Sequence, residues 1–383
     1  MIPPNLPDDD IAPFRAIEIS RLAHQMEAQG ASVLHLEFGQ PTAGAPSAAI
    51  ATAHKVLDSD AMGYWESPAL KARLAKSYDE LYGVTVDPEE IVLTCGASPA
   101  LVLALRAVFK PGDRVVLARP GYVAYRNVLK ALNLVPIELP CGPNTRYQLT
   151  AERLESVLPE PEGVILSSPA NPTGAIIPPA DMERLAALCA ERSIQIVSDE
   201  IYHNLVYEGR AASALEFASD ALIINSFSKY YAMAGWRLGW LVAKGAALDK
   251  ARALMGNLFL TAPSLAQHAG LAALDARAEL DVHLAGYARN RQRFLQALPE
   301  MGLTQVAPPD GAFYIYADVG HLTDKSLDLC RTILSDTGVA TAPGVDFDPV
   351  SGARFIRFSF AVSDAECEEA LARLIPWFQA RSG

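Results

Sequence analysis

The sequence has few cysteines, and they follow no recognisable pattern. Among its 383 residues there are five, no two of them are spaced as C-x-x-C, and the histidines do not cluster at metal-binding spacing. The five are Cys95, Cys141, Cys189, Cys330 and Cys367. We therefore expect separate, reduced thiols in a cytosolic (cytoplasmic) protein, and no metal site.

Long apolar runs and an excess of positive charge are also missing. No stretch of about 18 apolar residues occurs, so we expect no membrane-spanning helix. The first residues, MIPPNLPDDDIAPF, lack the basic region and apolar core of a signal peptide. Acidic residues outnumber basic ones by 44 to 32, which gives a net charge of −12. This charge argues against nucleic acid or an anionic membrane as the main partner.

What the sequence does contain is enough apolar material for a large core. Half of the residues are hydrophobic (50%) and 20% are charged, a balance typical of globular proteins and not of disordered ones. A chain of 383 residues is too long for one small core. We therefore expect two domains.

Short apolar runs occupy the middle of the chain, and each leads into small or polar residues. They are EIVLT (90–94), DRVVLA (113–118), GVILSS (163–168), IQIVS (194–198) and ALIINS (221–226). The pattern predicts a helix after each run, for example PADMERLAALCAERS (179–193) and FSKYYAMAGWRLGWLV (227–242). Apolar strands that alternate with helices predict an α/β fold with a mostly parallel sheet flanked by helices.

The two ends of the chain have a different pattern. Residues near 10–30 and 280–300 are helical in pattern, while GAFYIYADV (311–319) and RFIRFSFAV (354–362) are typical of antiparallel strands. A capping box from Ser363 to Glu366 opens a last amphipathic helix. We predict a large α/β domain over 45–275 and a small α+β domain made of 1–44 and 276–383.

Unusual polar or glycine-rich segments follow five of the predicted strands. They are Gly96-Ala97-Ser98, Gly121-Tyr122, Asn171 to Gly174, Asp199 to Tyr202, and Ser226 to Lys229. Open parallel sheets bind ligands just beyond the carboxyl ends of their strands, so neighbouring strands would bring these segments into one site. Taken alone, each has a simpler interpretation as a tight turn, a helix cap, a surface charge or a packing aromatic. We interpret His203, which has no evident partner in the sequence, as structural.

Lys229 is the residue that these simpler interpretations explain least well. It stands in SFSKYYAMAGWRLG (226–239), among small, aromatic and apolar residues. An enclosed lysine loses hydration and its pKa falls, which yields the neutral amine that attacks carbonyls and forms Schiff bases. Arg237, eight positions later, would further disfavour the protonated amine, hold a phosphate, or do both.

Three motifs in this order and spacing resemble the class I/II aminotransferases, pyridoxal-phosphate (PLP) enzymes of the aspartate-aminotransferase fold. They are SPANPTG (168–174), SDEIY (198–202) and SFSKYYAMAGWRLG. The resemblance runs from about Gly39 to the C-terminal helix. It implies transfer of an α-amino group between an L-amino acid and a 2-oxo acid by a ping-pong mechanism, with Lys229 carrying PLP as a Schiff base.

The resemblance also implies how the ring of the cofactor is held. Asp199 would pair with the pyridine nitrogen, Tyr202 and Asn171 would hydrogen-bond the phenolic oxygen, and Tyr122 would stack on the ring. Lys229, Asp199 and Tyr202 would be the catalytic residues.

The phosphate would lie on the turn Gly96, Ala97 and Ser98, with Ser226 and Arg237 as side-chain partners. The substrate α-carboxylate would be held by Arg357, helped by the backbone of Gly39 and by Asn171, whereas Arg354 matches a variable position. A homodimer is implied as well, with Tyr64 reaching the phosphate of the neighbouring subunit.

The substrate side chain is less constrained. In one aspartate-using branch of the family a lysine after the phosphate turn binds the distal substrate carboxylate, and this chain has Ser98 there. An arginine from the partner subunit could replace that lysine, so aspartate stays open as a donor, and neutral or aromatic amino acids are at least as probable. A C–S β-lyase of the same fold would need the same Lys229, Asp199 and Arg357. A non-enzymatic regulator of this fold would carry an added DNA-binding domain, for which the 40 or so residues before the matched region leave little room.

Overall fold

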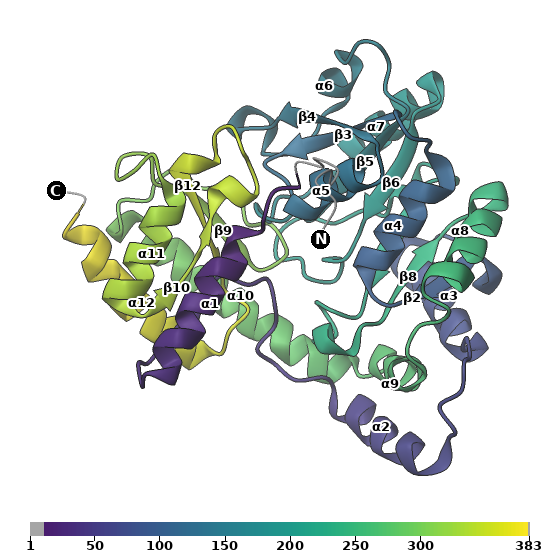
Figure 1. The fold of residues 1–383 in the computed structure, drawn as a ribbon, viewed down its shortest axis with the longest axis horizontal. Coiled ribbons are helices and arrows are strands. Elements are labelled where there is room, and N and C mark those ends of the chain that lie inside the picture. Colours follow the sequence, from purple (N-terminus) through teal and green to yellow (C-terminus); the bar gives the residue numbers. More distant parts are fainter. Residues whose placement is uncertain (1–10, 382–383) are drawn as a thin grey trace, which may run out of the picture.

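A computed structural model describes residues 11–381 of the chain. Its centre is a sheet of seven strands in the order β2-β8-β7-β6-β5-β3-β4 (Figure 1). The strands are β2 (Ile91–Thr94), β3 (Arg114–Arg119), β4 (Val135–Pro140), β5 (Gly163–Ser167), β6 (Gln195–Asp199), β7 (Leu222–Ser226) and β8 (Gly239–Val242). All neighbours are parallel except β8, which is antiparallel to both β2 and β7. The predicted α/β fold is therefore confirmed.

Helices cover both faces of this sheet. One face packs against α4 (Ala97–Val108), α5 (Val123–Ala131) and α8 (Gly245–Leu258). The other face packs against a larger group: α2 (Ser47–Ser59), α3 (Pro68–Tyr82), α6 (Ala151–Glu155), α7 (Pro179–Arg192) and α9 (Ser264–Leu274). Successive residues of a strand point to opposite faces, so strands buried on both sides carry consecutive apolar residues, as in Ile196-Val197 of β6 and Leu222-Ile223-Ile224 of β7.

The ends of the chain build a second core. Strands β11 (Ala342–Pro343), β12 (Phe355–Ser359) and β9 (Tyr314–Asp318) form an antiparallel sheet, and β1 (Leu34–His35) pairs in parallel with β10 (Val339–Ala340). Four helices lie around them (Figure 1): α1 (Arg15–Ala28), α10 (Arg277–Glu300), α11 (Ser326–Thr337) and α12 (Asp364–Gln379). The Ser363 capping box is formed at the start of α12. The domain boundaries that we predict near residues 45 and 275 stay a prediction.

One local prediction is wrong. The segment after β7 is not a helix, because the chain makes turns and a short 3₁₀ helix (Ala234–Trp236) before returning as β8. The return is fixed by the amide of Phe227, which donates to the carbonyl of Leu238. It also needs Gly239, where an added Cβ would come within 2.7 Å of the Gly96 backbone. Similar turns replace the helix that the pattern predicted after Asp199.

No helix among residues 11–381 is long and apolar enough to cross a membrane. Most of the N-terminal stretch in which we expect no signal peptide lies outside the described residues. All five cysteines are free.

Candidate active site

A cavity of about 320 Å³ lies at the carboxyl ends of the parallel strands. Ten of the residues predicted for the site line it: Gly39, Ala97, Ser98, Tyr122, Asn171, Asp199, Tyr202, Lys229, Arg237 and Arg357. They come together because β7, β6, β5 and β3 are neighbours in the sheet, so that the segments following these strands meet at one edge. Arg357 comes from β12 of the other sheet.

Lys229 lies three residues beyond β7, with its side chain partly buried. Its Nζ donates a hydrogen bond of 2.5 Å to the carbonyl oxygen of Gly39. Burial and the nearby charge of Arg357 lower the pKa of Lys229 to about 8, although Asp199 acts in the opposite direction. A substantial share of this lysine is therefore a neutral amine near physiological pH.

Asp199 is the last residue of β6 and is only 7% exposed. Its Oδ2 accepts a hydrogen bond of 2.7 Å from the hydroxyl of Tyr125, and its Oδ1 accepts one of 3.1 Å from the amide of Ile201. Burial raises the pKa of Asp199, and the two hydrogen bonds offset part of that effect. The site therefore holds a carboxylate that gains from a cationic partner.

Arg237 lies against the turn that opens α4. Gly96 caps this helix with a φ of +98°, and a Cβ there would come within 2.4 Å of the Arg237 Nη2. The guanidinium also donates to the carbonyl oxygen of Cys95 at 3.2 Å. The first amides of a helix have no partner inside it, so this turn offers an anion both N–H groups and a fixed positive charge.

Arg357 is 1% exposed and its guanidinium is held from several sides. It donates to Asn171 Oδ1 at 2.7 Å and to the Glu37 carbonyl oxygen at 2.5 Å. The rings of Tyr314 and Phe347 lie 4.4 and 4.7 Å from its Cζ. Its Nε has no hydrogen-bond partner among the described residues. The arginine is thus fixed in position and keeps a donor for an incoming anion.

The tyrosines of the cavity form a second group. The hydroxyl of Tyr202 lies 2.6 Å from that of Tyr314, and burial raises the pKa of Tyr202 well above its ordinary value. Tyr122 meets the ring of Tyr125 edge to face at 5.5 Å. Burial raises the pKa of Tyr122 too, so the phenols of Tyr202 and Tyr122 stay neutral and can donate hydrogen bonds.

The chain matches known proteins over nearly its whole length. The family model for class I and II aminotransferases matches residues 32–374. A protein of Mycobacterium tuberculosis named valine–pyruvate aminotransferase is 42% identical over 378 residues, which cover 97% of each chain. The chain belongs to the class I and II aminotransferases.

Solved structures agree with this membership. The crystal structure of an aminotransferase from Mycobacterium tuberculosis has a TM-score of 0.95 at 41% identity, covering 98% of this chain and 99% of that one. The aspartate aminotransferase of Thermus thermophilus, solved with maleate, has a TM-score of 0.90 at 29% identity, covering 97% of this chain and 99% of that one. The fold is that of the aspartate aminotransferases, and this chain is an aminotransferase.

The cavity of this aminotransferase fits the cofactor that the family implies. The turn at Gly96 lacks the Cβ that would fill the space beside Arg237, which leaves a cradle for a phosphate. Asp199 suits a protonated pyridine nitrogen, and Lys229 suits the aldehyde carbon of PLP. Gly39 is needed for the approach of Tyr314, because an added Cβ would come within 1.7 Å of the tyrosine hydroxyl.

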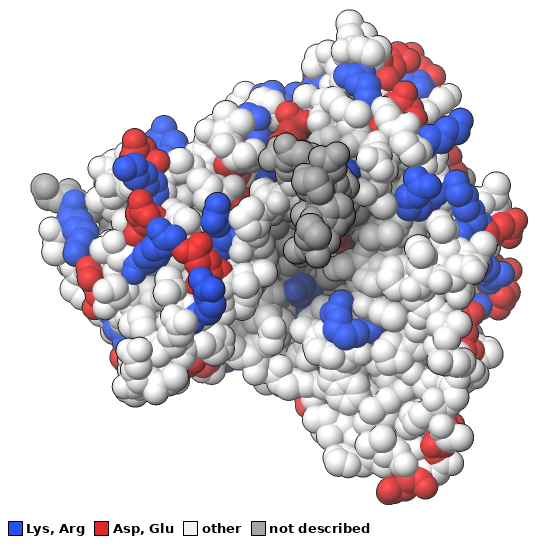
Figure 2. All heavy atoms as spheres, viewed as in Figure 1, with Lys and Arg blue, Asp and Glu red and all other residues white. Residues whose placement is uncertain are grey.

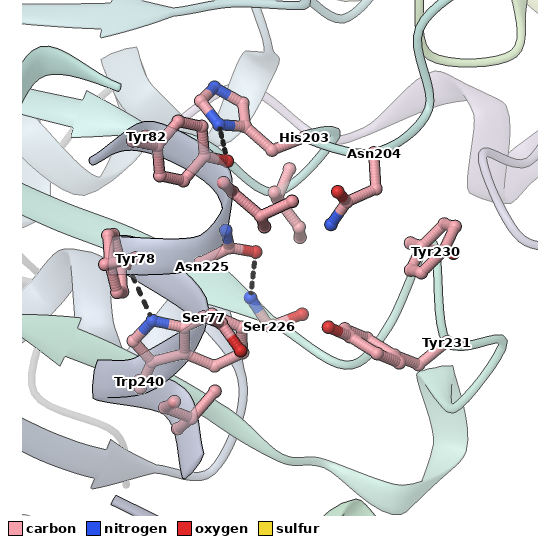
Figure 3. Close-up of a pocket in the computed structure, with 13 residues that line it drawn as sticks. Ser77, Tyr78, Tyr82, His203, Asn204, Asn225, Ser226, Tyr230, Tyr231 and Trp240 are labelled. Atoms are coloured by element: carbon pink, nitrogen blue, oxygen red, sulfur yellow. Dashed lines mark hydrogen bonds between the residues drawn. The ribbon is translucent and has the colours of Figure 1, made fainter. Parts of the chain in front are cut away.

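Ser226, predicted as a phosphate partner, is not brought into the cavity lining of the aminotransferase. It lines a smaller pocket behind the strand ends, where its amide donates to the side chain of Asn225 (Figure 3). Its Oγ accepts a hydrogen bond from the amide of Ser228, and Ser228 lines the main cavity instead. The small pocket also contains His203, which is 3% exposed and lies 2.6 Å from the Tyr82 hydroxyl through its Nδ1.

Two other residues lie away from the cavity. Tyr64 is 83% exposed. Arg354 forms a surface ion pair of 2.8 Å with Asp318, which leaves the cavity to Arg357.

Sequence reasoning missed two residues that complete the site of this aminotransferase. Tyr125 holds Asp199, and Tyr314 contacts both Tyr202 and Arg357. Tyr125 lies three residues after Tyr122, close to one turn along α5, and this spacing is the signal that would have pointed to it.

Proposed function

We propose that this aminotransferase uses PLP on Lys229 to move the amino group of a neutral L-amino acid to a 2-oxo acid by a ping-pong mechanism. The observation that carries the proposal is that Lys229, Asp199 and Arg357 line one cavity. These side chains supply a low-pKa amine, a buried carboxylate and a held guanidinium. The cofactor, when bound, supplies an electron sink for the negative charge that develops at the substrate Cα.

Arg357 orients the substrate. Its guanidinium pairs with the α-carboxylate, to which a planar fork is better matched than an ammonium group. The carbonyl of Glu37 and the side chain of Asn171 already hold it in place, so little side-chain entropy is lost on binding.

Lys229 moves the proton. Its amine is neutral in part near physiological pH, and we assign it the removal of the proton from Cα. Asp199 keeps the pyridine nitrogen protonated, and Tyr125 keeps Asp199 oriented. We assign Tyr202 and Asn171 to the phenolic oxygen and Tyr122 to the face of the ring.

The phosphate is assigned to the amides at Gly96, Ala97 and Ser98 together with Arg237. Ser226, which does not line the cavity, is assigned only an indirect role, because its Oγ accepts from the amide of Ser228, which does line it. Gly39 is assigned a backbone role towards the substrate.

A neutral donor follows from the charges in the cavity. Among the described residues that line it, the cations are Lys229, Arg237 and Arg357, and each already has a role. No further cation of this lining is left for a second substrate carboxylate. The name of the Mycobacterium tuberculosis relative, valine–pyruvate aminotransferase, supports a small aliphatic donor with pyruvate as acceptor.

The proposed assembly is a homodimer. Large apolar side chains are exposed on α2 and at the end of α8, and they include Ile50, Leu57, Leu258 and Leu260. The 258–264 segment is tied to the loop that carries Tyr64, because Thr261 donates to the Trp65 carbonyl and Ser264 to that of Gly63. Figure 2 shows few charged side chains over α2 and α9 on this face. A second copy of the chain would cover this region and receive Tyr64.

The free thiols also suit the cytosolic location that we propose.

The test is a spectral screen of the PLP-loaded protein with single amino acids. We expect valine and other neutral amino acids to convert the cofactor to its aminated form, and pyruvate to reverse the change. Aspartate as the best donor would refute the neutral-donor proposal. Release of pyruvate and ammonia from cystathionine would instead indicate a C–S lyase. No conversion by any amino acid would refute amino transfer, and sedimentation of the same sample tests the dimer.

A further inference from the structure

Two histidines and a glutamate lie together outside the active site. His24 and Glu27 are on α1, and His35 ends β1. One ligand atom from each lies within 4.8 Å of the others, and among the described residues this is the only such group of three or more His, Cys, Asp or Glu side chains. Sequence spacing gave no hint of it, because β1 and α1 bring the two histidines together only in the fold.

The hydrogen bonds of the two rings define their tautomers. His24 Nδ1 lies 2.7 Å from the carbonyl oxygen of Ser20, which can only accept, so Nδ1 carries the proton. His35 Nδ1 lies 2.9 Å from Oε1 of Glu37, a side chain that is 0% exposed. In the neutral rings, both Nε2 atoms therefore present a lone pair.

The lone pair of His35 faces a further acceptor. Nε2 of His35 lies 3.3 Å from Oε1 of Glu27. Two acceptors at that distance repel each other unless a proton or a metal ion lies between them. Ligands at about 2.0–2.1 Å from a tetrahedral zinc ion are themselves about 3.3–3.5 Å apart, which matches this separation.

His24, the third candidate ligand, lies close to His35 and Glu27. The rings of His24 and His35 have centroids 4.8 Å apart, and His24 and Glu27 are exposed side chains that are free to adjust. Glu37 supplies the carboxylate that usually orients a metal-binding histidine from its far nitrogen.

We propose that His24, Glu27 and His35 bind a divalent transition-metal ion of the zinc class, with water as the fourth ligand. Two imidazoles and one carboxylate suit zinc, and they do not suit magnesium or calcium, which prefer oxygen ligands. An open fourth position is typical of sites with three protein ligands.

The site is connected to the active site through residues 35–39. Glu37 holds His35 with its side chain and accepts from Arg357 with its carbonyl oxygen, and Gly39 accepts from Lys229. His24 and His35 also line a large cavity that shares Arg237 with the active site. A metal ion on His35 therefore fixes the segment that contacts both the substrate-binding arginine and the lysine.

The test is zinc binding to the PLP-loaded protein after dialysis against a chelator. Zn²⁺ is titrated in competition with a chromophoric chelator, and Co²⁺ serves as a spectroscopic substitute. We expect one site per chain with micromolar or tighter affinity, and an intense tetrahedral-type Co²⁺ spectrum. H24Q and H35Q should each weaken binding by about 100-fold, and E37Q by about 10-fold to 100-fold.

His268 provides a matched control. It is a part-exposed histidine near a carboxylate, 3.9 Å from Asp60, and it stacks on Trp65. H268Q should bind zinc as the wild type does. The proposal is overturned if the wild type binds no zinc in this range, if H24Q and H35Q bind as H268Q does, or if Co²⁺ keeps an octahedral spectrum. Unchanged circular dichroism of H24Q excludes misfolding as the cause of lost binding.

Discussion

The hydroxyl of Tyr125 stabilises the ionised form of Asp199, and Tyr125→Phe removes this hydrogen bond. The two oxygens are 2.7 Å apart, and Tyr125 is 5% exposed. Phenylalanine fills the same space except for the hydroxyl, so packing is nearly unchanged. The variant therefore removes a hydrogen bond to a buried carboxylate at little cost in packing.

The expected cost depends on pH, and its sign follows from the pKa of Asp199. Burial raises the pKa of Asp199, so the ionised carboxylate destabilises the cofactor-free native state. This loss of stability begins as pH rises through the pKa of Asp199 in the unfolded chain. It is complete above the pKa of Asp199 in the folded protein. Tyr125 offsets part of this cost. A hydrogen bond to a charged group contributes about 1.5–3 kcal/mol and one to a neutral group about 0.5–1.5 kcal/mol. The loss in Y125F should therefore be about 1 kcal/mol larger at neutral pH than at acidic pH.

The measurement is urea unfolding of cofactor-free wild type and Y125F under both conditions. Tyr316→Phe is the matched control, because Tyr316 is 1% exposed and its hydroxyl has no hydrogen-bond partner among the described residues. Y316F should change the free energy of unfolding little, at either pH. An equal loss for Y125F at neutral and acidic pH, or an equal loss for Y125F and Y316F, would refute the reasoning.

Three further predictions concern the cavity. R357K should raise KM for the amino donor by about 10-fold to 100-fold, because lysine cannot replace the bidentate fork, and steady-state kinetics checks this. G96A should weaken retention of PLP during dialysis, because its Cβ would come within 2.4 Å of Arg237 Nη2 and the residue has a φ of +98°, a strain of about 1–3 kcal/mol. The rate at which the cofactor-free protein captures PLP should rise with pH and level off above about 8, since burial lowers the pKa of Lys229 to about 8; a rate that keeps rising towards the ordinary lysine value would contradict this.

The strands of the fold were predictable because burial on both faces produces a recognisable run of apolar residues in the sequence. Ile196 and Val197 of β6 face opposite cores, so these consecutive positions are both apolar. The antiparallel β8 was not predictable in this way. Its direction depends on the turn between Phe227 and Leu238 and on the close contact of Gly239 with Gly96, which is 143 positions away. Local pattern carries no information about such a contact.

The site was predictable where a residue follows directly from a strand end. Asp199 and Lys229 are placed by the end of their own strands, so the α/β pattern itself predicted their meeting. Tyr125 and Tyr314 were missed because each acts through a partner that is distant in sequence, 74 and 112 positions away. The family resemblance supplied Arg357, whose place in the cavity depends on how β12 meets the large sheet.

Arg357 also explains how substrate binding would affect the whole chain. Its guanidinium contacts Asn171 from the turn after β5 and Glu37 from the N-terminal segment, and it is itself part of β12. Three segments that are far apart in sequence therefore meet at the group to which we assign the α-carboxylate. A carboxylate bound there neutralises a charge that lowers the pKa of Lys229, so it should raise that pKa and tighten the contacts around it. Substrate binding and the state of the catalytic amine are thus coupled through one arginine, and a substrate without an α-carboxylate would lose both effects together.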